Sequence, residues 1–560
     1  MRRHTYWFGT LAVVTLALAL RLGPLWWSPL PFNPDGIGYA ARAGEAITTG
    51  HLPVAGQATD QFGYTALLAV VARATGHPPL TIAQPTSALV GAASCLVAVG
   101  LGRRVAAGAG LSTERSRAAG VLAGLLLAVD GLYVYRSMPT DEQTAGLLLV
   151  PLVAVAAWRA LRTGRWAWRG IAVVLFLVLP PLHNHAGAVA AMMLTALLAI
   201  HVVDRPRPDT AVRALCVGGL AWLWALGYHP ATAAISTAVV VQADRVTRVP
   251  GLFVAWILLV AVLAAWFVTT DRRLQRGTTL GIVAVLFAVL AVNAVRAVFP
   301  GTPTTHPVLL LTLGLLALPA AAGAVGVHRL TGQTTVGPAM LALVVGPLGL
   351  IGFSLTGGLT VEYLATLYRS QLYLHLPLAI AAGITTLVLA RRVRDGEQHW
   401  TARAVRGGVP VVLVLCAAAS VPVAFAGLEL LTYKGVTTPA EFHATGHAVD
   451  AGEPWATDDH LARVGGYFVS GASRGNDRQA YGGARGPVRR WLIESGPPPD
   501  CAVLAQRSWT TTGAQFHPRE PVRVESEALQ RWLASRDVVY ATGQVDPLVL
   551  VRGANAGECR

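Results

Sequence analysis

Residues 117–162 read RAAGVLAGLLLAVDGLYVYRSMPTDEQTAGLLLVPLVAVAAWRALR, two long apolar runs joined by a short polar segment. Each run has about the 20 residues that a helix needs to cross a bilayer. The pattern recurs along the chain and predicts thirteen spans, at 6–27, 84–102, 117–136, 144–162, 170–184, 186–203, 213–228, 250–270, 278–298, 306–328, 334–355, 371–390 and 408–427. We therefore expect a polytopic α-helical membrane protein.

Composition supports this class and argues against a nucleic-acid partner. Hydrophobic residues make up 54% of the chain and charged residues 13%, and the mean hydropathy is +0.52. These values exclude an ordinary soluble protein. The net charge of +15 lies almost entirely before residue 428. It therefore reflects membrane topology and attraction to lipid headgroups, not binding of nucleic acid.

The arginines predict the orientation in the membrane. They crowd every second loop, as at Arg103 and Arg104, whereas the loops between carry the notable carboxylates Asp35, Asp141 and Glu362. Because basic loops stay in the cytoplasm, the N-terminus is predicted to be cytoplasmic. An odd number of spans then places the C-terminal part outside. The protein is expected in the cell membrane, with an acidic site on its external face.

The chain divides into a transmembrane domain, residues 1–427, and an external soluble α/β domain, residues 428–560. A long external loop, 28–83, is expected to carry a helix on the membrane surface at 37–48 and a second surface helix or a re-entrant helix at 62–76. The external domain has three short strand-like runs, at 502–505, 538–541 and 548–551. It also has two helical candidates, at 488–494 and 526–535. Cys501 and Cys559 both fall in this domain, where an oxidising compartment permits a disulfide, but the sequence leaves their pairing open.

Two external loops carry the strongest candidate residues. Asp35 lies just after the first span, where it suits either a helix cap or a general base or metal ligand. Arg136, Asp141 and Glu142 follow the third span. They form either an exposed ion pair or a carboxylate pair that meets Asp35 across a cavity, with Arg136 on an anionic substrate.

Further polar residues fall on the same predicted side. Glu362 and Arg369 are seven residues apart and share one face of a helix. Arg369 suits either a lipid-linked phosphate or a snorkelling anchor to headgroups. His183 and His185 suit metal or phosphate binding, or a plain turn. Asp130, nearer the membrane, is either a packing residue or part of a cavity.

Taken together, these features resemble the GT-C superfamily of membrane glycosyltransferases, which includes protein O-mannosyltransferases, aminoarabinose transferases and oligosaccharyltransferases. The matching features are Asp35 after the first span, surface helices in the long loop, and Arg136 with Thr140-Asp141 after the third span. His77-Pro78-Pro79 is similar to the His-Pro-Pro of the mannosyltransferases. The external domain lacks the Trp-Trp-Asp-Tyr-Gly motif of the oligosaccharyltransferases, which favours transfer of a single sugar.

The resemblance implies inverting transfer from a polyprenyl-phosphate sugar to an external acceptor, which is a glycan, a lipid or a protein. Asp35 would activate the acceptor hydroxyl. Asp141 and Glu142 would position the acceptor or, with Asp35, a divalent metal such as Mg²⁺ or Mn²⁺. Glu362 would lie elsewhere in the same cavity.

The donor phosphate would be bound by the basic residues of the external loops. Arg136 and Arg369 would neutralise the charge that develops on the leaving phosphate, and His183 and His185 would assist them. The alternative is a multi-pass transporter with an external acidic site. Transporters place ionisable residues near the bilayer midplane and often show inverted repeats, and the sequence displays neither.

Overall fold

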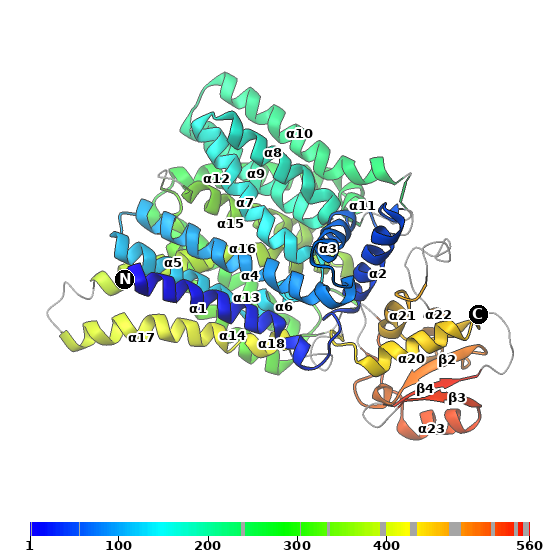
Figure 1. Cartoon of the computed structure of the whole chain (residues 1–560). Helices are drawn as coiled ribbons and strands as arrows, with labels where there is room; N and C mark the ends of the chain where they lie inside the picture. The colour runs from blue at the N-terminus through cyan, green and yellow to red at the C-terminus, as the bar shows by residue number, and fades with distance from the viewer. Residues whose placement is uncertain are drawn as a thin grey trace.

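The computed structural model describes residues 1, 3–54, 57–233, 235–236, 241–302, 304–332, 336–392, 399–425, 434–469, 483–516, 521–542, 547–552 and 559. Figure 1 shows a bundle of long helices with a small α/β unit at one end. The N-terminus lies at the opposite end of the bundle from this unit.

Apolar helices build the membrane part. In chain order they and their short connecting helices are α1 (Arg3–Leu22), η1 (Gly23–Trp26), α2 (Pro34–Thr49), α3 (Phe62–Thr75), α4 (Pro79–Gly108), α5 (Thr113–Ala128), α6 (Gly131–Ser137), α7 (Glu142–Thr163), α8 (Trp166–Leu182), α9 (Asn184–Asp204), α10 (Pro208–Thr232), α11 (Val241–Arg248), α12 (Pro250–Thr269), α13 (Arg272–Val295), α14 (Pro307–Gly326), η3 (Val327–Arg329), α15 (Gly337–Gly357), α16 (Val361–Arg392), α17 (His399–Ala418) and α18 (Val421–Phe425).

Every predicted span coincides with one of these helices, so the polytopic helical fold class is confirmed. Within the described residues, eleven helices are long and apolar enough to cross a bilayer. The pair α5 and α6, bent by 69°, makes a twelfth if it counts as one span. Helix α8 is a shorter apolar helix of 17 residues. The expected thirteen therefore exceeds the eleven long spans because one predicted span is broken into α5 and α6 and another, α8, is short.

The long loop after α1 forms two helices, α2 and α3, close to the predicted surface helices. Helix α2 begins where the Asn33 side chain accepts a hydrogen bond from the backbone N–H of Asp35, and Pro34 occupies the first turn. It ends at Gly50, whose φ of 78° suits glycine. The rings of Tyr39 and Tyr64 join α2 to α3 edge to face, 4.9 Å apart. This buried contact holds the start of α2 in place.

The C-terminal unit is a four-stranded sheet covered by helices. Its elements are α20 (Pro439–Asp450), β1 (Trp455–Ala456), α21 (Asp459–Gly465), α22 (Gly486–Ile493), β2 (Ala502–Gln506), η6 (Arg507–Thr510), α23 (Ser526–Ala534), β3 (Val538–Ala541) and β4 (Leu548–Val551). The strand order is β1-β2-β4-β3, with β1 parallel to β2 and the other pairs antiparallel. Three strands and two helices match the sequence expectation. The expected boundary at 427/428 lies outside the described residues.

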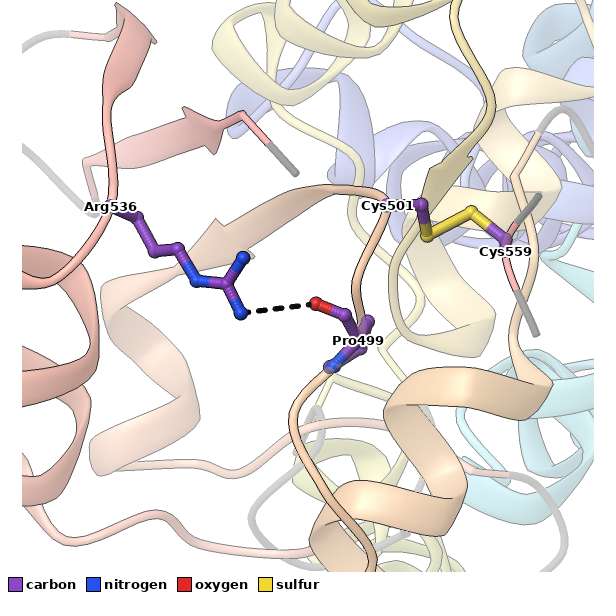
Figure 2. The surroundings of a disulfide bond; sticks show 4 residues. All are labelled: Pro499, Cys501, Arg536 and Cys559. Atoms are coloured by element: carbon purple, nitrogen blue, oxygen red, sulfur yellow. Dashed lines mark hydrogen bonds between the residues drawn. A yellow bond between two sulfur atoms is a disulfide. The ribbon is translucent and has the colours of Figure 1, made fainter. Parts of the chain in front are cut away.

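Cys501 and Cys559 form a disulfide, which the sequence left open. Figure 2 shows it at the start of β2, close to Pro499, whose carbonyl oxygen accepts a hydrogen bond of 3.5 Å from Arg536. The bond fastens residue 559 to the sheet.

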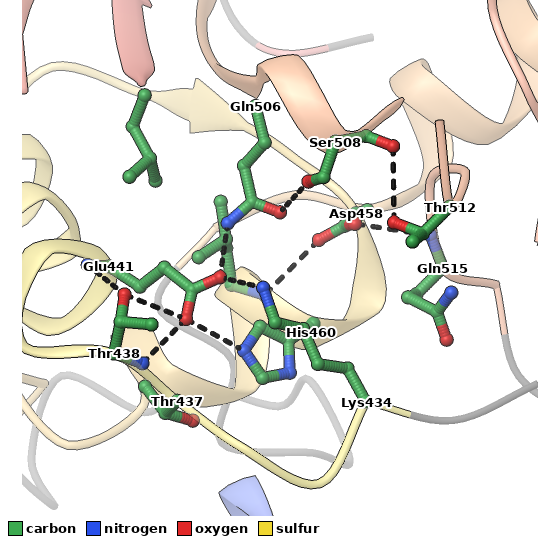
Figure 3. Close-up of polar contacts among 12 residues, drawn as sticks. Lys434, Thr437, Thr438, Glu441, Asp458, His460, Gln506, Ser508, Thr512 and Gln515 are labelled. Carbon is green, nitrogen blue, oxygen red and sulfur yellow. Dashed lines mark hydrogen bonds and ion pairs between the residues drawn. The ribbon is translucent and has the colours of Figure 1, made fainter. Parts of the chain in front are cut away.

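Polar side chains fill part of this unit's core, and Figure 3 shows them. Glu441, only 1% exposed, accepts hydrogen bonds from Lys434, from Gln506 (2.6 Å) and from the backbone N–H of Thr438 (2.7 Å). His460 lies 3.6 Å from the same carboxylate. Glu441 also completes the capping box that starts α20. The network therefore orients α20 against the sheet.

The backbone leading into this unit runs beside the loop that carries Asp35. The N–H of Asn33 donates to the carbonyl of Gly435 over 2.7 Å, and the Ser28 hydroxyl donates to the carbonyl of Thr437 over 2.5 Å. A Cβ atom at Gly435 would lie 2.4 Å from the Phe32 ring, so any other residue there would require the ring to move. These contacts fix the C-terminal unit against the start of α2.

Candidate active site

A cavity of about 590 Å³ lies where α2, the C-terminal unit and several spans meet. Its walls are of two kinds. The charged wall has Asp35, Asp130, Arg136, Asp141, Arg369 and Arg463, with Asn33 and His375 beside them, and further polar groups of the lining come from Asn293, Thr302, Thr304, Thr305 and Gln371. The apolar wall comes mainly from α13, α14 and α16, with Val283, Leu286, Phe287, Leu290, Leu309, Leu313, Leu316, Leu372, Leu374 and Leu378. Such a cavity suits a ligand with a polar head and a long apolar chain.

Asp35 lies on the charged wall, in the first turn of α2. Because Asn33 caps this helix, the Asp35 carboxylate is not used as the cap, the simpler role that the sequence allowed. Its Oδ1 accepts a hydrogen bond of 2.8 Å from Nη1 of Arg463, on α21. The Asp35 side chain remains 44% exposed, so it is accessible from the cavity. The C-terminal unit thus contributes an arginine directly to the site.

Asp141 and Glu142 stand on the same side, at the start of α7. Asp141 caps this helix by accepting from the backbone N–H of Gln143 over 3.1 Å. Burial raises the pKa of Asp141, but a hydrogen bond from Glu142 and the charge of Arg369 lower it more, to about 2. Glu142 is buried and accepts a hydrogen bond from Tyr39 of α2. Asp141 is therefore an ionised carboxylate. Among the described contacts, neither acid forms the exposed ion pair with Arg136 that the sequence allowed.

The two arginines predicted to bind phosphate both line the cavity. Arg136 lies over the ring of Tyr135, with 4.9 Å between the guanidinium carbon and the ring centroid. This packing directs a long flexible side chain along the wall. Arg369 comes from α16, and its positive charge lowers the pKa of Asp141. The loops after the first and third spans and the start of α16 therefore converge, as the sequence reasoning required.

Asp60 is a candidate that the sequence reasoning missed. It lies just before α3, and its charge interacts with those of Arg369 and Asp141. Burial raises the pKa of Asp60, and Arg369 opposes that rise. The sequence signal for Asp60 was a single acid between Thr59 and Gln61 in the long loop. Such an acid is usually a turn residue, so the signal did not indicate a site.

The predicted histidines lie behind the site. His183 Nδ1 accepts from the N–H of Ala186 over 3.2 Å and so caps α9. The His183 side chain is fully buried. His185 lies 3.1 Å from the Ser370 hydroxyl. Neither histidine belongs to the described lining of the cavity. The contact with phosphate that the sequence suggested for them therefore has no support.

Glu362 pairs with Arg248 over 3.0 Å, and both side chains are about half exposed. It begins α16 but does not belong to the described lining of the cavity, where the sequence placed it. Glu362 and Arg369 do lie on one helix, as their spacing predicted.

The acidic residues do not fit a metal centre. In the part of the chain that the structure describes, no group of three or more histidine, cysteine or acidic side chains is arranged to hold an ion. Asp35 is bound by Arg463, and Glu142 is bound by Tyr39. A metal held jointly by Asp35, Asp141 and Glu142 is therefore not supported, and no chemical step is assigned to one.

Fold and site together define the class: a multi-pass membrane protein with a cavity that is charged at one wall and apolar at the other. No family model and no curated protein matches the sequence.

Several solved structures are similar to the chain at low sequence identity. The oligosaccharyltransferase AglB from Archaeoglobus fulgidus, in complex with an inhibitory peptide and a dolichol-phosphate, is 14% identical over 86% of this chain and 64% of that chain, with a TM-score of 0.45. The apo form of the Archaeoglobus fulgidus enzyme is 13% identical over 91% and 70%, with a TM-score of 0.48. ArnT from Cupriavidus metallidurans, bound to undecaprenyl phosphate, is 11% identical over 98% and 99%, with a TM-score of 0.34. The chain therefore spans less than two thirds of the length of the first of these proteins.

Proposed function

We propose that this chain is a membrane glycosyltransferase of the GT-C type. It transfers a sugar, with inversion, from a polyprenyl-phosphate donor to an acceptor at the external face. The observation that carries the proposal is the cavity itself, in which Arg136 and Arg369 lie on a charged wall next to a long apolar wall. An arginine pair matches a phosphate, and the apolar wall matches a polyprenyl chain.

The cavity carboxylates supply the remaining parts of the reaction. Asp35 is half exposed in the cavity and takes the proton of the acceptor hydroxyl as that oxygen attacks the sugar. Asp141, ionised beside Arg369, orients the acceptor, and Glu142 holds Asp141 in place. Arg136 and Arg369 stabilise the phosphate as it leaves. The acceptor is a glycan, lipid or protein outside the membrane, and the N-terminus is cytoplasmic, as the arginine pattern predicts.

Sugar transfer from radiolabelled polyprenyl-phosphate sugars to endogenous acceptors tests this proposal. Membranes with the wild type, with Asp35→Asn and with Asp450→Asn are compared, since Asp450 is an exposed acid at the end of α20. We expect Asp35→Asn to lose about 10³-fold in rate, while Asp450→Asn keeps full activity. Absence of transfer from every donor by a folded wild-type protein would refute the proposal and favour the transporter alternative.

A further inference from the structure

Asp130 and His375 form a pair that the proposed reaction does not yet use. Asp130 lies at the 69° bend between α5 and α6. Its Oδ1 caps α6 by accepting from the N–H groups of Leu132 (3.1 Å) and Tyr133 (3.2 Å). Its Oδ2 lies 2.5 Å from Nδ1 of His375, on α16. One oxygen is thus committed to the backbone and the other to the imidazole.

The surroundings hold this pair in one arrangement. The N–H of Gly131 donates to the Ser420 hydroxyl over 2.8 Å, and the backbone of Ser420 leaves no room for a side chain at Gly131. The ring of Tyr133 packs near that of His375, with the centroids 6.2 Å apart. Because Asp130 accepts the proton on Nδ1, the other ring nitrogen, Nε2, is the one available to a ligand.

Both side chains line the cavity, and each is just over one tenth exposed. His375 follows Arg369 by six residues on α16, which is about 9 Å along a helix. Its neighbours on the wall are Leu374 and Leu378. His375 therefore lies between the charged wall and the apolar wall, where the proposed function places the junction between the donor's phosphate and its chain.

We infer that His375 is a further catalytic residue, which donates the Nε2 proton to the leaving phosphate, and that Asp130 is its positioning residue. The inference rests on the proposed function. The acceptor oxygen forms its bond to the anomeric carbon as the bond from that carbon to the phosphate oxygen breaks. The electron pair stays on the phosphate oxygen, which takes the proton from a doubly protonated His375. The acceptor proton passes to Asp35.

Lipid binding gives the first test. Purified wild type, His375→Gln and His328→Gln are titrated with undecaprenyl phosphate and with undecaprenol. His328 is the matched control, a buried histidine that hydrogen-bonds with Arg276 and lies outside the cavity lining. We expect His375→Gln to bind undecaprenyl phosphate about tenfold more weakly, since it loses a charge-assisted hydrogen bond. Binding of undecaprenol should not change.

The outcomes separate this inference from the function on which it rests. If the wild type does not bind undecaprenyl phosphate, the proposed function fails. If the wild type binds it and His375→Gln binds equally well, or loses both lipids equally, only the role of His375 fails.

Asp130→Asn provides a second variant, because asparagine keeps the cap of α6. Its amide places an N–H toward Nδ1 and disfavours the doubly protonated ring. We expect Asp130→Asn to lower kcat with little change in the KM for the acceptor. In the double variant, kcat should lie within twofold of that of His375→Gln alone. Independent, multiplying effects would show that Asp130 does not act through His375.

Discussion

Acidic side chains gather in two regions of this molecule, and their acceptor positions are filled in different ways. In the C-terminal unit, Glu441 receives hydrogen bonds from Lys434, Gln506 and Thr438. Asp458 receives them from Trp509 (3.2 Å) and from the backbone of Leu461 and Gln515. These acids are 1% exposed, and neither belongs to the cavity lining.

In the cavity, Asp35 and Asp141 have fewer partners among the described residues and face open space. A carboxylate whose acceptor positions are filled by its own fold stabilises that fold. One that keeps acceptor positions open toward a cavity is available to a substrate. The same residue type therefore has a structural role in one region and a chemical role in the other.

Asp141→Asn should give the largest difference between the two regions. The amide oxygen still caps α7, but the negative charge beside Arg369 is lost. We expect kcat to fall roughly 10³-fold with no loss of thermal stability. Transfer kinetics and thermal unfolding of the same preparation measure both. A variant that unfolds in proportion to its loss of activity would place Asp141 with the structural acids.

Glu441→Ala should have the opposite profile. Removing the carboxylate leaves Lys434 and His460 without their buried counter-charge, so the C-terminal unit should lose about 3 kcal/mol of stability. Chemical denaturation followed by tryptophan fluorescence measures this loss. Below the unfolding transition, the remaining folded protein should keep its rate of sugar transfer. A drop in kcat at full folding would contradict the division between the regions.

Acid should affect the C-terminal unit through the same residue. Burial alone would raise the pKa of Glu441, but His460 and Lys434 lower it more, to well below its ordinary value of 4.5. Since the unfolded state binds the proton more readily, the contribution of Glu441 is complete above pH 4.5 and declines as the pH falls below it. Unfolding temperatures measured between pH 3 and 7 should decline less steeply in Glu441→Gln. Equal slopes in the two proteins would exclude this explanation.

Arg463→Ala probes the point where the two regions touch. Its ion pair with Asp35 is partly exposed, so we expect a modest loss of about fivefold in kcat/KM. Arg463→Lys should recover part of the lost kcat/KM, because lysine keeps the positive charge but lacks the planar guanidinium that hydrogen-bonds Asp35. If Arg463→Ala is as inactive as Asp35→Asn, Arg463 itself contacts the substrate.

Glu362→Gln should have the smallest effect. The pair with Arg248 is about half exposed and lies outside the described cavity lining. Exposed pairs contribute about 0–1 kcal/mol, so activity and stability should each change by less than twofold. Steady-state kinetics with saturating donor provides the measurement. A loss of tenfold or more in activity would show that Glu362 acts in the cavity, where the sequence placed it.

The sequence was informative where a local pattern determines the structure. Runs of apolar residues located every span, and the spacing in 28–83 located α2 and α3. The three predicted strands were found because each is a short apolar run between turns. The elements missed include β1, α20 and α21 of the C-terminal unit, which are short or polar, so their burial depends on contacts that are distant in the sequence.

The site was predictable only in part, for the same reason. Asp35, Arg136, Asp141 and Arg369 were singled out because charges at the ends of apolar helices are unusual. Their convergence depends on helix packing that no local pattern encodes. The contact of Arg463 with Asp35 joins residues 428 positions apart, which no local pattern reveals.

Gly435 has a practical consequence for engineered hybrids. The backbone at 435–437 lies against residues 28–33, and the Phe32 ring fills the space that any side chain at 435 would need. A C-terminal unit taken from another protein and joined after residue 434 would therefore pack against the Phe32 ring, the Ser28 hydroxyl and the Asn33 N–H of this chain, to which it is not matched. Chimeras should exchange 28–33 together with the C-terminal unit, because these two segments are packed and hydrogen-bonded against each other.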